Sequence, residues 1–129
     1  MKKEIIICIV IIIIIIMGNY ITQNYAKESV QELNNKLNEL REEISKEQVD
    51  NEKAQKYLKE VEEIWNNRHD KLAYYIEHDE LEKVETNMTS MKSFIENKEY
   101  PECISELDKS VFILEHIEEK YKFSLENIF

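Results

Sequence analysis

The feature that most constrains this chain is an apolar run near its N-terminus. Residues 5–17 contain only isoleucine, valine, cysteine and methionine, and residues 5–21 include no charged side chain. As a helix, residues 5–21 would be about 25 Å long, near the minimum needed to cross the hydrocarbon core of a bilayer. β-branched residues favour strands in water, but a helix satisfies its own backbone in lipid. The sequence therefore predicts a transmembrane anchor over residues 1–21.

A cleaved signal peptide is the alternative interpretation, because Lys2 and Lys3 precede the apolar run as basic residues do in secretory signals. The following segment, residues 18–26, has no Ala-x-Ala-like cleavage pattern, which favours a retained anchor. We therefore expect a single-pass protein of the cell membrane that contacts lipid through residues 5–21. The basic-residue bias across the span is small, and the default signal-anchor orientation places the soluble part outside the cytoplasm.

The composition of the whole chain indicates long helices with an acidic surface. Among 129 residues there are 27 Asp and Glu against 17 Lys and Arg, a net charge of −10, with one glycine and one proline. Nucleic-acid binding is excluded, because phosphate contacts require a basic surface. The single glycine excludes Gly-rich phosphate loops and turn-rich β architectures. An acidic domain is also repelled by anionic lipid, so we expect it to stand off the membrane surface.

After the anchor, apolar residues recur at alternating steps of three and four. They are Val30, Leu33, Leu37, Leu40 and Ile44. This short heptad seam predicts a helical stalk over residues 22–49 and offers a surface for homo-oligomers, the 30–44 seam. Asp50 suits the N-cap of a second helical stretch, residues 52–96, which contains no glycine or proline. A break near residues 66–70 is the alternative to one continuous helix there.

The segment 97–101 is the clearest turn, with Asn97 at a helix end and Pro101 at the start of the next helix. We expect that last helix to end near Phe123, with Ser124 capping a short final turn. Its second, partly apolar face carries Phe112, and we expect residues 54–65 to cover that face. The predicted fold is all-α: an N-terminal transmembrane helix, the stalk, and an antiparallel helical hairpin or small three-helix bundle over residues 50–129.

Two histidines on this hairpin lie at similar heights, and each follows a glutamate. His78 and His116, together with Glu82 and Glu85, form a candidate metal- or ligand-binding set, because imidazole and carboxylate groups suit zinc or iron. The Glu-x-x-His spacing of di-iron bundles is absent. The alternative is partly buried histidines that are hydrogen-bonded to helix carboxylates, so we expect no metal and no cofactor.

The remaining candidates have structural alternatives. Trp65 is either part of a ligand surface or an aromatic wedge between helices, and Cys103, Met88 and Met91 are expected in the core. The chain contains no Gly-rich loop, Cys-x-x-Cys pair or nucleophile elbow, so we expect no catalytic residues and no enzyme activity. The candidates for interaction with a partner are Trp65, His78, Glu85 and His116.

Three stretches of the sequence are distinctive: YIEHDELEKVE at 75–85, FILEHI at 112–117 and SLENIF at 124–129. With the anchor and Trp65, they make the chain resemble a family of small membrane-anchored proteins catalogued as domain of unknown function 4363, found mainly in clostridia. The matching positions include the His78, Glu82, Glu85 and His116 set. The family has no assigned activity, so the resemblance implies no catalytic residue.

The resemblance also implies a membrane partner, because family members are often encoded beside a larger multi-spanning membrane protein. We therefore predict a non-enzymatic interaction or adaptor module at the cell envelope that binds a membrane or envelope protein. A metal- or ligand-sensing module that uses a His78/His116 cluster is the alternative.

Overall fold

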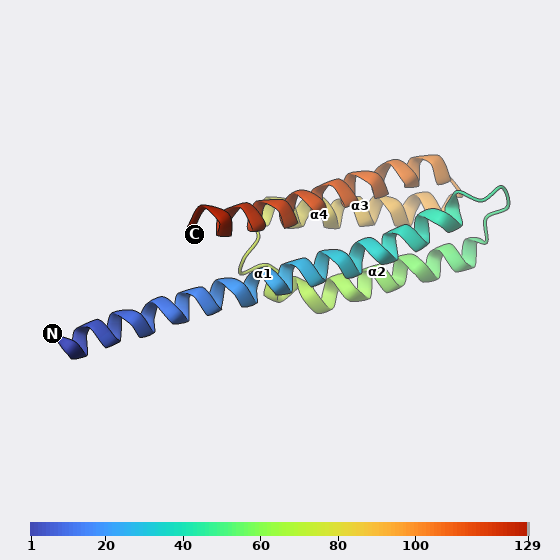
Figure 1. Cartoon of the computed structure of the whole chain (residues 1–129). Helices are drawn as coiled ribbons and strands as arrows, with labels where there is room; N and C mark the ends of the chain where they lie inside the picture. Colours follow the sequence, from blue (N-terminus) through green and yellow to red (C-terminus); the bar gives the residue numbers. More distant parts are fainter. Residues whose placement is uncertain (129) are drawn as a thin grey trace.

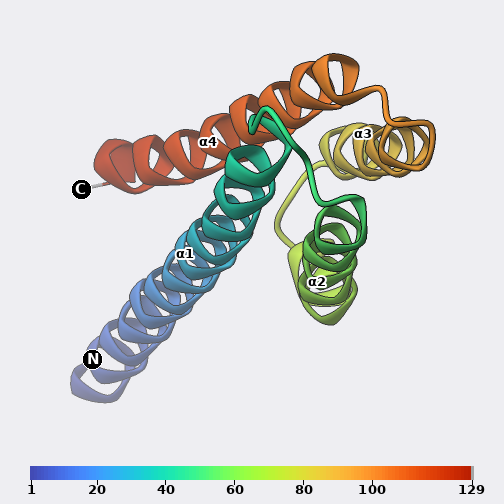
Figure 2. The same ribbon diagram turned by 90° about the vertical axis from the view of Figure 1, so that its right-hand side faces the viewer.

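The computed structural model of the protein describes the backbone of residues 1–128 and the side chains of residues 1–120. It contains four helices, α1 (Lys2–Ile44), α2 (Asn51–Leu72), α3 (His78–Glu96) and α4 (Tyr100–Ile128), and no strand within that part of the chain. Each helix packs on the next, and α4 packs back on α1 (Figures 1 and 2). Short connections make neighbours antiparallel, so the helices close a bundle. The predicted all-α class is confirmed.

α1 is one uninterrupted helix with two different environments. Large apolar side chains of residues 5–17 are exposed, whereas the apolar residues from Ala26 to Ile44 are at most 3% exposed. Figure 1 shows the N-terminal part of α1 projecting beyond the other three helices. The segment expected as a stalk therefore adds a fourth helix to the expected three-helix bundle. The 30–44 seam is covered by α2 and α4 of the same chain, because these helices supply the apolar partners that a second copy would otherwise supply.

The stretch expected as one helix divides into α2 and α3 at residues 73–77. The break comes after the alternative position near residues 66–70. It is bracketed by the buried side chains of Leu72 and Ile76, which hold the connection against the core. Because of this reversal, α2 and α3 face the core from different sides, and the buried residues before and after the break do not form one helical stripe. Asp50 caps α2 as predicted, and its Oδ1 accepts a hydrogen bond from the Lys53 N–H at 3.2 Å.

The turn between α3 and α4 is confirmed, but Lys98 takes the left-handed conformation, with φ 59°. Asn97, which was expected at the helix end, follows the last residue of α3 and has φ −90°. α4 begins at Tyr100, one residue before Pro101, so the proline lies in the first turn where no intrahelical donor is needed. The Asn51 side chain donates hydrogen bonds to the Tyr100 hydroxyl at 2.8 Å and to the Ile95 carbonyl at 2.7 Å, which ties α2 to this turn.

α4 packs on α1 and α3, and among the described residues its backbone does not come close to that of α2; the Asn51–Tyr100 hydrogen bond links the two helices at one end. Residues 54–65 therefore do not cover the second face of α4 as expected, and Phe112 is 70% exposed. The four antiparallel helices form a ring in which α2 lies diagonally opposite α4. α4 also continues past residue 123 to Ile128, and the expected cap at Ser124 falls on side chains outside the described residues.

The core assignments of the sulfur-containing residues are confirmed. Met88 is 5% exposed, and Met91 and Cys103 are fully buried. The Cys103 Sγ lies 3.8 Å from the Met91 carbonyl oxygen. Burial raises the pKa of the Cys103 thiol to about 12, so the reactive thiolate is scarce at neutral pH. Cys103 is therefore a packing residue of the α3–α4 interface.

Candidate functional site

The two histidines of the candidate set reach different carboxylates. His78 Nε2 lies 2.9 Å from Glu82 Oε1, one turn along α3, with the His78 side chain 79% exposed. His116 Nε2 lies 3.9 Å from Glu80 Oε1, across the α3–α4 interface, with the His116 side chain 60% exposed. Both imidazoles thus pair locally at the surface. Among the residues with described side chains, no group of three or more His, Cys, Asp or Glu is placed to hold a metal ion.

Glu85 belongs to a separate cluster between α2 and α3. Its Oε1 accepts a hydrogen bond from the Trp65 indole N–H at 3.1 Å and lies 3.1 Å from His69 Nε2. Trp65 is 2% exposed, and its ring centroid lies 5.8 Å from that of His69. Trp65 is therefore an aromatic wedge whose polar edge is satisfied by the neighbouring helix. The structure joins Trp65 to Glu85 and separates both from His78 and His116.

His69 is the member of this cluster that the sequence analysis missed. It follows Trp65 by four residues, so the two side chains share one face of α2. Beside the cluster lies a pocket of about 190 Å³, lined by Glu62, Trp65, Asn66, Glu85, Met88 and Thr89. The pocket is small and its walls are mostly polar, which suits water or a small polar group more than an organic cofactor.

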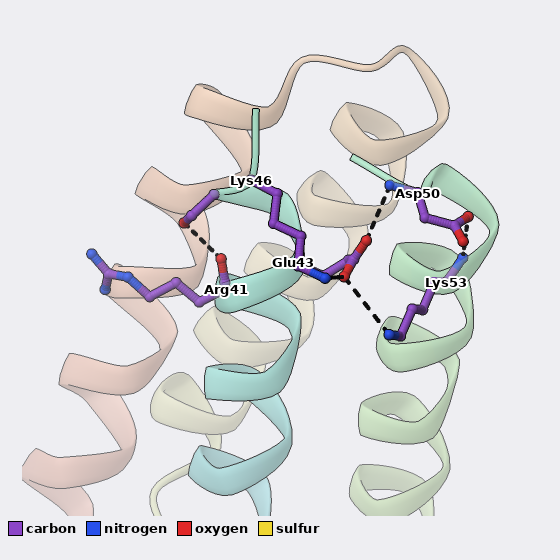
Figure 3. A network of polar contacts seen from close by, with 6 residues as sticks. Arg41, Glu43, Lys46, Asp50 and Lys53 are labelled. Atoms are coloured by element: carbon purple, nitrogen blue, oxygen red, sulfur yellow. Dashed lines mark hydrogen bonds and ion pairs between the residues drawn. The ribbon is translucent and has the colours of Figure 1, made fainter. Parts of the chain in front are cut away.

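A buried carboxylate stands at the opposite end of the bundle, where α1 passes into α2. Glu43 is 3% exposed, and its oxygens face the Lys46 Nζ at 2.6 Å, the Asp50 backbone N–H at 3.0 Å and the Lys53 Nζ at 4.0 Å (Figure 3). The Ser45 hydroxyl donates to the Arg41 carbonyl at 2.6 Å and closes the end of α1. These three polar partners of Glu43 all come from the α1–α2 corner itself.

The hydrogen bond from Lys46, followed by that from the Asp50 backbone, lowers the pKa of Glu43 below its ordinary value of 4.5. A catalytic acid needs a pKa raised toward neutrality, which is the opposite shift. Glu43 therefore remains charged and fixes the corner geometry. Its role is to join the C-terminal end of α1 to the N-cap of α2.

A cluster of cations and one aromatic ring lies at the other end of α2. The Arg68 guanidinium lies 5.1 Å from the centroid of the Tyr25 ring, and the Lys71 Nζ lies 5.4 Å from it. Arg68 also pairs with Glu32 at 2.6 Å and donates to the hydroxyl of the buried Ser29 at 3.2 Å. These contacts attach the end of α2 to α1 close to residue 21, where the exposed apolar part of α1 ends.

An open groove follows the outer face of α3 and α4 and has a volume of about 570 Å³. Phe112 is the exposed aromatic residue in this groove. The groove is lined by Lys83, Asn87, Ser105, Asp108, Lys109, Phe112 and Ile113. An exposed aromatic side chain with a polar rim is typical of a protein contact surface. Phe112 was expected on a covered face, and only the arrangement of the helices places it at the surface.

We expect Glu85→Ala to destabilise the protein by about 1 kcal/mol, because it leaves the indole N–H of the buried Trp65 without its partner. The emission of Trp65, the one tryptophan in the chain, should shift at the same time. Thermal unfolding of the full chain in detergent, followed by circular dichroism, gives the stability. Glu82→Ala removes an exposed carboxylate of the same helix, whose partner His78 is itself at the surface, and serves as the control. An unchanged emission spectrum in Glu85→Ala would contradict the assigned contact.

We expect Glu43→Gln to destabilise the protein in a pH-dependent way. The folded-state pKa of Glu43 is depressed, so its charge stabilises the fold above about pH 4.5, and this contribution is lost as the pH falls through the folded-state pKa. The difference in unfolding free energy between wild type and Glu43→Gln should therefore be greatest at neutral pH and shrink in acid. Chemical denaturation at several pH values measures it. Glu42→Gln, at an exposed position, should show no such trend.

Comparison with known proteins gives one family. The family model described as Domain of unknown function (DUF4363) matches residues 20–128, which includes most of α1 after the apolar run and all of α2, α3 and α4. No match was found among curated proteins or among solved structures. The matched region covers most of the chain and coincides with the bundle. The chain therefore belongs to the DUF4363 family.

Proposed function

We propose that this protein is a single-pass, membrane-anchored helical module whose bundle binds another protein at the cell envelope. The observation that carries the proposal is the continuity of α1. The helix holds an apolar stretch long enough to cross a bilayer, and its residues 5–17 lie outside the bundle. The same helix supplies the buried seam of the bundle from Ala26 onward. A retained anchor would thus hold the bundle at the membrane without a flexible linker.

A signal sequence has the same length and apolar character as this part of α1. The proposal therefore includes that residues 1–21 are retained and not cleaved. The helical conformation of residues 18–26 and their lack of an Ala-x-Ala-like pattern support retention. The default signal-anchor orientation then puts the bundle outside the cytoplasm.

The interaction role is supported by the surface of the bundle. Outside α1, three large hydrophobic residues are exposed within the described side chains: Tyr74, Tyr75 and Phe112. Phe112 lies in the α3–α4 groove, on the flank of the bundle, where a neighbouring membrane protein can reach it. The candidate chemical groups pair with one another: His78 with Glu82, and Glu85 with Trp65. This pairing supports a non-enzymatic role.

The anchor is tested with the double variant Ile11→Arg and Ile14→Arg. Both side chains are exposed and touch none of the bundle core, so the bundle should remain folded. We expect the wild-type chain to stay in the membrane fraction after alkaline carbonate extraction and the variant to be released, because arginine near the bilayer centre is costly. Intact mass measurement of the membrane-bound chain checks retention. A mature chain that lacks residues 1–21 would contradict the anchor.

The partner surface is tested by photo-crosslinking in intact cells, with benzoylphenylalanine in place of Phe112. We expect a discrete crosslinked species from position 112 and none from Lys59, which lines a groove of about 400 Å³ between α2 and α3. Ser105→Arg places a long cation in the α3–α4 groove and should reduce the crosslink several-fold. Equal crosslinking from positions 112 and 59 would contradict a specific contact at this groove.

A further inference from the structure

One end of the bundle, called its lower end, is where α2 passes into α3. This end lies level with the end of the apolar stretch of α1. On one side of α1, Arg41 pairs with Asp108 of α4. Ile21 precedes Arg41 by as many residues as Ile128 follows Asp108, about 30 Å of helix in each case. The end of α4 therefore lies about level with Ile21, the last residue of the uncharged stretch. Figure 1 shows the C-terminus and the α2–α3 connection on the same side of the bundle, beside the projecting part of α1.

The α2 side of the bundle gives the same level independently. Lys36 of α1 pairs with Glu60 of α2 at 3.1 Å. Thr22 precedes Lys36 by as many residues as Tyr74 follows Glu60, so Tyr74 lies about level with Thr22. The contact of Lys71 with the Tyr25 ring fits this register. Two helices thus end where the apolar stretch ends, and residues 22–25 are helical, so no flexible segment separates the bundle from that stretch.

The surface at this level has the side chains that a lipid headgroup layer attracts. We define the basal surface as Tyr25, Lys71, Tyr74 and Tyr75. Tyr74 is 83% exposed and Tyr75 is 38% exposed, although their neighbour Ile76 is buried and fixes the connection. Tyrosine concentrates at membrane interfaces, where its ring meets the hydrocarbon edge and its hydroxyl meets water, and a lysine beside it can reach lipid phosphates.

The charges around the basal surface are mixed. Lys71 is accompanied by Asp70, whose side chain is 98% exposed, and Asp79 is exposed at the start of α3. Glu77 pairs with Lys120 at 2.7 Å. This balance of carboxylates and cations suits a zwitterionic headgroup layer, which offers phosphates and ammonium groups together. A surface selective for anionic lipid would show an excess of cations.

We propose that the basal surface lies in the zwitterionic headgroup layer of the bilayer that α1 spans, so that the bundle rests directly on the membrane. This inference rests on the proposed anchor. It is the opposite of the stand-off that the net charge of −10 alone predicts. The continuous α1 helix sets the height of the bundle, and the α2–α3 connection meets the headgroups at that height.

The experiment uses the full chain in phosphatidylcholine vesicles that contain a small fraction of headgroup spin-labelled lipid. Tyr74→Trp places a fluorophore on the basal surface. Phe112→Trp is the matched control, because Phe112 is similarly exposed but lies about level with Leu37. That level is about 22 Å farther along α1 than Thr22, with which Tyr74 is level. Trp65 gives the same background in both variants, and circular dichroism checks that both are folded. We expect several-fold stronger quenching of the added tryptophan in Tyr74→Trp than in Phe112→Trp.

The outcomes separate this inference from the anchor. Equal, weak quenching in both variants, with the protein retained by the vesicles after carbonate, overturns the headgroup contact and leaves the anchor in place. Release of both variants from the vesicles overturns the anchor and the inference with it. Equal, strong quenching means that the bundle lies on its side, which also overturns the proposed upright contact.

Discussion

The structure depends on the apolar seam of α1 and its burial by α2 and α4. From Ala26 to Ile44, α1 gives the bundle a continuous row of apolar side chains that are at most 3% exposed. Burying such a row stabilises the fold by about 1.5 to 3 kcal/mol for each large side chain before conformational entropy is subtracted. Within the described residues the backbones of α2 and α4 do not come close to each other, so this row joins the two helices on the side of the bundle opposite α3.

Polar contacts fix how the other helices meet this seam. At the upper end, where α1 passes into α2, Glu43 joins α1 to the start of α2. Asn51 joins that start to the Tyr100 hydroxyl. At the lower end, Arg68 holds α2 to Glu32 and Tyr25 of α1. The two ends of α2 are therefore attached to α1 by directional contacts, and the Lys36–Glu60 pair adds one near its middle. Together with the apolar packing, these contacts set the register on which the level of the α2–α3 connection depends.

The sequence predicted local features well because local chemistry determines them. Asp50 is an N-cap because its short carboxylate reaches an unpaired N–H, and this depends on no distant residue. The fate of the 30–44 seam was harder, because a heptad pattern is the same whether its partner is a second copy or another part of the chain. The break at residues 73–77 contains no glycine or proline, so no local signal marked it.

The candidate site was predicted only in part, because its contacts also depend on which helices become neighbours. Trp65 and Glu85 are both distinctive residues, but their hydrogen bond depends on the α2–α3 reversal, which the sequence pattern did not fix. His78 and His116 were correctly placed on α3 and α4, yet their imidazoles turn to nearby carboxylates. Height along a hairpin is readable from residue counts, whereas the azimuth of a side chain depends on which helices pack on either side.

In the proposed attachment, the rigid helix limits the distance of the bundle from the membrane, whereas the acidic charge acts on its tilt. Repulsion between the acidic surface and anionic lipid falls off over about 8 Å in physiological salt, so it acts mainly on surfaces close to the membrane. A flexible linker would let this repulsion push the whole bundle away. A continuous helix removes that freedom, and tilt about the base becomes the motion on which the repulsion acts. Under the proposed attachment, tilting would bring the acidic flanks toward any anionic lipid, so the charge would favour an upright bundle with Phe112 on an accessible flank.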